Sequence, residues 1–100
     1  MINAKKIPAW MVLSGEAVTV TLSKPSEANG VQVDTLRLRA PTVRDIRAAQ
    51  TNAGGDDEQR ELNLFASLAE IGAKDVEGLT LKDYSRLQAG YFRLVQDDEL

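Results

Sequence analysis

The chain has 100 residues, of which 43% are hydrophobic and 27% are charged, and its formal net charge is −3. This length and composition are typical of one globular domain and exclude a disordered tail or linker. The chain contains no cysteine and no histidine, which excludes disulfides, thiol nucleophiles, imidazole bases and the usual zinc ligands. Because phosphate-binding and calcium-loop patterns are also absent from the sequence, we expect a protein that is not an enzyme and holds no metal or cofactor.

The N-terminal part of the chain, residues 1–16, contains an apolar run at residues 7–13. Spanning a bilayer takes roughly 20 apolar residues, and the residues after the run lack a clean signal-peptide cleavage site. We therefore expect a cytoplasmic protein with no membrane partner. The run has two interpretations: a cover or third strand for a hairpin, or a mobile apolar arm that contacts a partner through Trp10 and Met11.

Two segments have the pattern of strands. Residues 17–22 alternate strictly between apolar and polar side chains, which predicts a half-buried strand. Residues 24–30 are rich in turn formers and end in Asn29-Gly30, a pair suited to tight reversals. A second strand is predicted at residues 31–39, so the two strands form an antiparallel hairpin.

In the second strand the apolar residues occupy odd-numbered positions at Val31 and Val33 but even-numbered positions at Leu36 and Leu38. A regular strand cannot place both pairs on one face, because side chains alternate with a period of two. A bulge or kink near residues 34–35 would place both pairs on the buried face.

Helix signals follow directly. Pro41 ends the second strand, and Thr42 with Asp45 has the pattern of a capping box, which predicts a helix from residue 43 to about residue 52. This helix should be the least stable one, because its inward stripe has few apolar candidates. They are Val43, Ile46 and Ala49.

Asp56 or Asp57 is expected to cap a second helix that reaches about Ile71 and is closed by Gly72. Its apolar residues cover an arc of roughly 220°, which is wider than one packing face requires. Either this helix is sandwiched inside the domain, or one flank meets another chain and the protein is a homo-oligomer. The flank carries Leu64, Leu68 and Ile71.

Residues 74–77 predict one short helical turn, and Thr80 with Asp83 repeats the capping-box pattern before a last helix. Gly90 is placed on the polar flank of this helix. The apolar stripe carries Leu81, Tyr84, Leu87, Tyr91, Phe92, Leu94 and Val95. We place Leu87, Tyr91 and Phe92 in the core, although an aromatic stripe also suits a helix-in-groove contact with Tyr84 and Tyr91 at the boundary with water.

The charges do not favour nucleic acid as a partner. Acidic residues are concentrated at residues 56–58 and 97–99, and the net charge is negative. The arginines at positions 37, 39, 44 and 47 could form a local basic patch. We interpret them as a solvated face, because no aromatic residues are interleaved with them.

These patterns predict an α+β fold, in which an N-terminal antiparallel β-hairpin, with or without a third short strand, precedes three to four short helices. The predicted organisation is an arm or cover strand at residues 1–16, one domain at residues 17–96 and an acidic terminus at residues 97–100.

The order of the motifs VTVTL, LRLRAPTVRDI, ELNLFASLA and GLTLKDYSRLQAGYF resembles the tail assembly chaperones of Mu-like and related tailed bacteriophages. The resemblance rests on pattern and order rather than on a catalytic signature. It implies a protein that binds the tape measure protein, a long helical and aggregation-prone chain, and keeps it soluble and competent until tail tube protein polymerises around it. It also implies action in the cytoplasm of the infected or lysogenic bacterial host and absence from the mature virion.

Two other functions stay open at this point: a structural or completion component of the assembled phage tail, and a small regulatory DNA-binding protein. The candidate partner-binding residues follow from arguments about apolar surface. They are Trp10, Met11, Leu64, Leu68, Ile71, Tyr84 and Tyr91.

Overall fold

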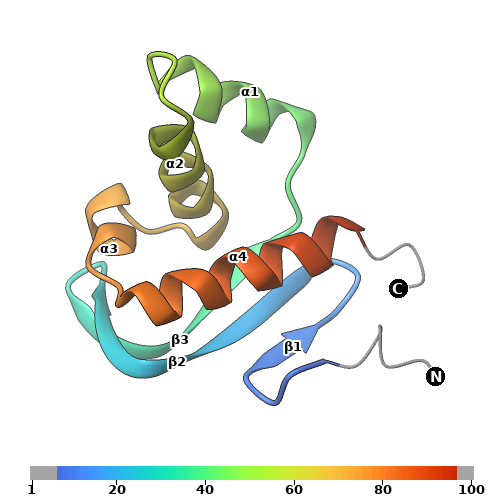
Figure 1. Cartoon of the computed structure of the whole chain (residues 1–100), viewed down its shortest axis with the longest axis vertical. Helices are drawn as coiled ribbons and strands as arrows, with labels where there is room; N and C mark the ends of the chain where they lie inside the picture. The colour runs from blue at the N-terminus through green and yellow to red at the C-terminus, as the bar shows by residue number, and fades with distance from the viewer. Residues whose placement is uncertain (1–6, 97–100) are drawn as a thin grey trace.

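The computed structural model describes residues 7–96 and shows a small sheet packed against helices (Figure 1). The strands are β1 (Met11–Leu13), β2 (Ala17–Ala28) and β3 (Val31–Arg39), and the helices are α1 (Val43–Thr51), α2 (Asp57–Ala69), α3 (Ala73–Glu77) and α4 (Leu81–Gln96). The predicted α+β class is confirmed, with a third short strand and four helices in the described part of the chain. None of the helices within residues 7–96 has the length and apolar character needed to cross a membrane. The first six residues of the predicted arm and the predicted acidic terminus lie outside the described residues.

The strands form an antiparallel sheet in the order β1-β2-β3. Met11 of β1 pairs with Val20 of β2, which pairs with Leu36 of β3. Apolar side chains from all three strands therefore share one face. Trp10, just before β1, is half-buried, and the guanidinium of Arg86 on α4 lies 5.0 Å from the centre of its ring. The N-terminal apolar run thus supplies the third strand, and the alternative of a mobile arm is wrong for its described part.

The hairpin turn is tighter than the sequence pattern predicts. β2 continues to Ala28, and only Asn29 and Gly30 separate it from β3. Both have positive φ angles, 54° and 80°, as a two-residue hairpin turn requires. The prediction of a turn over residues 24–30 was wrong, because the strand ladder resumes before the hairpin tip.

The ladder between β2 and β3 shifts register between Thr21 and Ser26 of β2. The irregularity predicted near residues 34–35 is present, and the additional residues belong to β2. Val33 becomes half-buried, but Val31 remains 62% exposed. Burial of Val31 was therefore wrongly predicted, because it lies at the tip of the hairpin.

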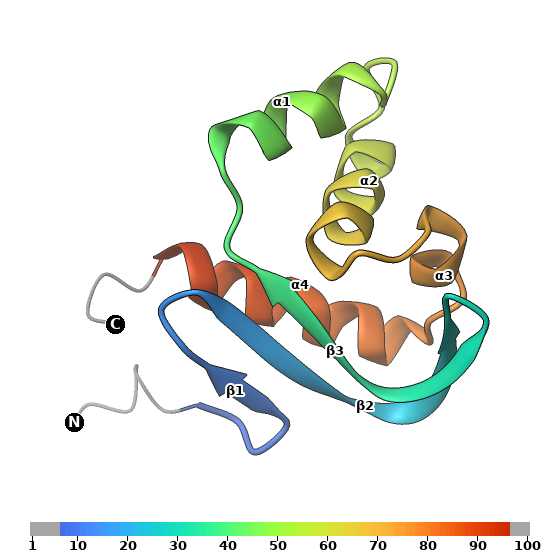
Figure 2. The same cartoon turned by 180° about the vertical axis from the view of Figure 1, so that it is seen from behind.

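α4 lies across β1 and β2, and α2 packs against β3. Figure 2 shows the same arrangement from behind, with the strands in front of α4. The fully buried side chains of the core include Val18, Leu38, Phe65, Leu68 and Leu87. The described chain therefore has two layers around one core.

Gly90 lies where α4 crosses β2. A Cβ atom at this position would lie 3.1 Å from Val20 Cγ2 and 3.3 Å from Val18 Cγ2. The prediction of Gly90 on the polar flank was wrong, because its missing side chain lets the helix approach the strand closely.

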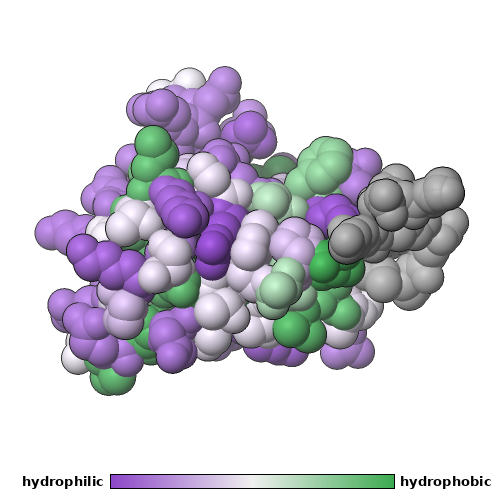
Figure 3. Space-filling view, turned by 60° about the horizontal axis from the view of Figure 1, so that its bottom comes forward, coloured by the Kyte–Doolittle hydropathy of each residue, from purple (hydrophilic) through white to green (hydrophobic). Residues whose placement is uncertain are grey.

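The buried stripe of α4 is narrower than predicted. Leu87 is fully buried, as predicted, and Tyr91 is half-buried, but Phe92 is 60% exposed and Leu81 is 80% exposed. Phe92 is about 200° around the helix from Gly90, so it points away from the sheet, and its predicted place in the core was wrong. Figure 3 shows hydrophobic residues in separate groups among polar residues on the face that it draws.

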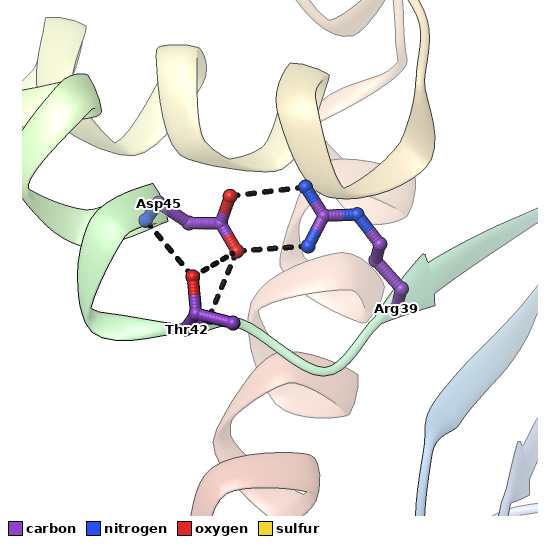
Figure 4. Close-up of polar contacts among 3 residues, drawn as sticks. All are labelled: Arg39, Thr42 and Asp45. Atoms are coloured by element: carbon purple, nitrogen blue, oxygen red, sulfur yellow. Dashed lines mark hydrogen bonds and ion pairs between the residues drawn. The ribbon is translucent and has the colours of Figure 1, made fainter.

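α1 begins with the predicted capping box (Figure 4). Thr42 Oγ1 accepts a hydrogen bond from the Asp45 N–H at 3.2 Å, and the Asp45 carboxylate accepts one from the Thr42 N–H at 2.8 Å. Asp45 also accepts two bonds from the Arg39 guanidinium, at 2.8 and 3.0 Å. The bonds from Arg39 and then from Thr42 lower the pKa of the Asp45 carboxyl below its usual range. Val43 is 76% exposed, so its predicted inward place was wrong, whereas Ala49 is buried.

The connection from the end of α2 through α3 to the start of α4 is held at both ends by hydrogen bonds between side chains and the backbone. α2 ends at Ala69, and its C-cap residue Glu70 has the left-handed conformation with φ of 60°, whereas Gly72, which was predicted to close this helix, is the N-cap of α3. The Asn29 side chain donates to the Glu70 carbonyl at 3.1 Å, which ties the hairpin tip to this junction. α4 starts as predicted after Thr80, whose hydroxyl accepts from the Asp83 N–H at 3.1 Å.

The first turns of α4 bind the edge of β2 beyond the end of β1. The Asp83 carboxylate, in a residue that is 1% exposed, accepts from the Ser23 N–H at 2.7 Å and the Lys24 N–H at 3.3 Å. One turn later, Arg86 donates to the Thr21 carbonyl at 2.7 Å. Burial opposes ionisation of Asp83, but hydrogen bonds from Ser23 and its neighbours outweigh it and lower the pKa of the carboxyl. Side chains of α4 therefore bind the part of this edge of β2 that the short strand β1 does not cover.

Candidate functional site

A groove of about 410 Å³ lies between the first half of α2, α3 and the start of α4. Figure 1 shows these three elements on one side of the molecule, away from the chain termini. Its carboxylates come from Glu58, Glu61 and Glu77, and its apolar side chains are Leu62, Val76, Leu79 and Leu81. Tyr84 and Gln88 complete the lining. We call it the acidic groove.

Aromatic side chains pack against one another beside and beneath the acidic groove. The ring of Phe65, which is fully buried, lies 5.7 Å from the ring of Tyr84 and 5.4 Å from that of Tyr91, between centroids. Both pairs are tilted at 53°, a favourable arrangement for aromatic rings. Val76 of α3 is 2% exposed and closes the space beside them. The apolar floor therefore belongs to the core and is formed before any partner binds.

One carboxylate of the acidic groove is held by its neighbours. The Tyr84 hydroxyl and the Gln88 amide, the latter at 2.8 Å, both donate to Glu61 Oε1. Burial, together with the bond to the Glu61 carboxylate, raises the pKa of the Tyr84 hydroxyl. The hydroxyl therefore stays protonated as a donor, and Glu61 has a fixed orientation between α2 and α4.

Leu81 stands at the rim of the acidic groove. It is the first residue of α4 and is 80% exposed. An apolar side chain of this size gains free energy when a partner covers it, on the order of 2 kcal/mol for full burial. The site thus combines a buried apolar floor, an exposed apolar rim and carboxylates around them.

Three of the residues proposed from the sequence as partner-binding lie in the core. Met11, Leu64 and Leu68 are 4%, 5% and 1% exposed. The flank of α2 that was considered as a contact with a second chain is therefore covered largely by other elements of the same chain. The wide apolar arc belongs to a helix sandwiched within the domain.

The other four candidates are half-buried, and only Tyr84 and Tyr91 lie near each other, on either side of Phe65. Tyr84 lines the acidic groove, and Tyr91 packs behind it on Phe65. Ile71 borders a separate hollow of about 310 Å³ between β3 and the end of α2, and Trp10 lies under Arg86. The structure therefore brings one of the predicted residues directly into the site.

Most of the acidic groove was missed at the level of the sequence. Leu62 and Leu81 were counted in core stripes, and Glu61 was not singled out. A signal was available in Leu79 and Leu81, which flank Thr80 at the predicted start of the last helix. Within residues 7–96, no cluster of three or more His, Cys, Asp or Glu side chains is arranged to hold a metal ion.

Comparison with known proteins adds one decisive finding. The family model described as phage tail assembly chaperone proteins, E, or 41 or 14, matches residues 19–96. The chain belongs to this family. The match covers every residue of the acidic groove in the tail assembly chaperone, and it implies protein partners in tail assembly. No curated protein and no solved structure matches the chain.

Proposed function

We propose that this tail assembly chaperone binds the tape measure protein of its phage and keeps it soluble and ready for assembly until tail tube subunits polymerise around it. It acts by binding alone, without catalysis or a cofactor, in the cytoplasm of the bacterial host, and it leaves before the virion is complete. The observation that carries the proposal is the family match over residues 19–96.

The surface of the protein supports this role. A chaperone for a long helical chain needs apolar contact sites of modest area that can be filled many times along the client, and enough charge to keep the complex soluble. The acidic groove offers such a site. The net charge of −3 adds solubility.

Co-expression tests the proposal. The tape measure protein of the same phage is produced alone and together with this chain, and its soluble fraction and any co-purified chaperone are measured. The proposal predicts a larger soluble fraction and a stable complex. A client that is equally soluble without the chaperone, and does not co-purify with it, would refute the function.

Mass spectrometry of purified virions separates the chaperone from a structural component of the tail. A chaperone is absent from finished particles, whereas a completion protein is present in fixed copy number. Detection of this chain in virions at the level of tail proteins would favour the structural role.

A further inference from the structure

We propose that the acidic groove binds one amphipathic helix of the client, through an aliphatic anchor residue flanked by lysine or arginine. That this client is the tape measure protein rests on the proposed function. The chemistry of the bound helix follows from the groove itself.

The shape of the acidic groove suits a single helix. The acidic groove is an open hollow of about 410 Å³ between helices, with Leu62 and Leu79 half-buried inside it. A hollow of this size takes one or two aliphatic side chains and their helix backbone, as in other helix-in-groove complexes. It is too small to enclose a folded domain.

The charge of the acidic groove suits a basic helix. Glu58, Glu61 and Glu77 line the groove, whereas no basic residue of its three helices does. These basic residues are Arg60, Lys74, Lys82, Arg86 and Arg93. A carboxylate that loses water on binding needs a cationic partner, because an unpaired buried charge is costly. A helix with lysine or arginine beside its anchor meets this need, whereas an acidic helix is repelled.

The rim of the acidic groove leaves an apolar side chain exposed beside the floor. Leu81 is 80% exposed although it adjoins a preformed apolar floor. A helix seated on the floor would cover Leu81 at the same time. The rim would then contribute to affinity without any rearrangement of the chaperone.

The test uses two synthetic peptides of about 18 residues, roughly five helical turns. Both carry leucine on one face at helical spacing; one has lysine beside the leucines and the other has glutamate at the same places. Binding of each fluorescent peptide to the full chain is measured by anisotropy at low and high salt. The lysine peptide should bind, more weakly at high salt, and the glutamate peptide should not. Equal binding of both peptides, or no binding of the lysine peptide, overturns the proposal.

A matched pair of variants locates the contact. Leu81 and Val43 are each the first residue of a helix, and they are 80% and 76% exposed. Leu81→Ser should weaken binding of the lysine peptide about tenfold, whereas Val43→Ser should leave it unchanged. Equal effects of the two substitutions would overturn the assignment to the groove.

A second pair tests the charges. The double variant Glu58→Gln with Glu77→Gln should weaken binding severalfold and reduce its dependence on salt. The control, Glu16→Gln with Glu27→Gln, removes the same charge from exposed positions in the loop before β2 and near the end of β2. If both pairs reduce binding equally, the peptide responds to net charge and the groove is not its site.

Co-expression with Leu81→Ser separates this proposal from the proposed function. If the wild-type chain raises the solubility of the tape measure protein and the variant does so equally well, the groove is wrong and the function stands. If the wild-type chain has no effect on the tape measure protein, the function fails, and the peptide measurements still decide the groove.

Discussion

Replacing Asp83 by alanine should destabilise the protein more than any loss of a helix cap can. The Asp83 carboxylate is almost completely buried and accepts from two N–H groups of β2, at 2.7 and 3.3 Å. A hydrogen bond to a charged group contributes about 1.5–3 kcal/mol. Because Ser23 and Lys24 are exposed, water replaces part of the loss, and we expect a decrease of about 3 kcal/mol in the free energy of unfolding.

Urea unfolding at neutral pH, followed by far-ultraviolet circular dichroism, measures this loss. With a slope of about 1.5 kcal/mol/M, the midpoint should fall by about 2 M. Thr80→Ala is the matched control, because it removes the Thr80 hydroxyl from the Asp83 N–H and carboxyl but leaves both bonds from β2 to Asp83 in place, and it should cost about 1 kcal/mol. If Asp83→Ala costs no more than Thr80→Ala, the contact with β2 does not stabilise the fold and the reasoning is refuted.

Three further outcomes are expected. Leu87→Ala should lower the free energy of unfolding by about 3 kcal/mol, because the side chain is fully buried. Phe92→Ala should change it by less than about 0.5 kcal/mol in the same urea titration. Equal losses would show that Phe92 belongs to the core. Gly90→Ala should lower the thermal midpoint, because the strain of a Cβ only 3.1 Å from a valine of β2 outweighs the gain of about 1 kcal/mol in helix propensity. A higher midpoint would show that β2 can move to accept the methyl group. Because the pKa of Asp45 is lowered, its bond to Arg39 stabilises the fold fully above about pH 4, and this stabilisation is lost as pH falls further. Asp45→Asn should therefore be less stable at neutral pH, and its stability, measured by circular dichroism, should depend less on pH in the acid range. An acid dependence equal to that of the wild type would contradict this.

The elements of this fold follow from local patterns. The strand at residues 31–39 and the capping box of Thr42 with Asp45 depend on neighbouring residues alone, and both were predicted correctly. The irregular ladder was predicted as well, because two apolar parities within one strand cannot share a face.

The arrangement of side chains between elements could not be read in the same way. The apolar periodicity of α4 includes Phe92 and excludes Gly90, yet the helix approaches β2 through its glycine. This contact depends on β2, because Val20, which lies opposite Gly90, precedes it by 70 residues in the sequence. For the same reason the acidic groove was not predicted, since its walls come from three helices whose relative positions no local pattern contains.

The attachment of α4 to β2 also has a consequence for how the chain is made. Asp83 and Ser23 are 60 residues apart, and at about 5–20 residues per second a ribosome needs several seconds to translate from the hairpin to the end of the last helix. During that interval the nascent sheet has neither the cover of α4 nor the side chains that occupy the edge of β2, and an open strand edge beside an uncovered apolar face favours aggregation. Translation that stops before residue 81 should therefore release an insoluble product, and the sheet of this tail assembly chaperone is itself unprotected until the sixteen-residue helix α4 is complete.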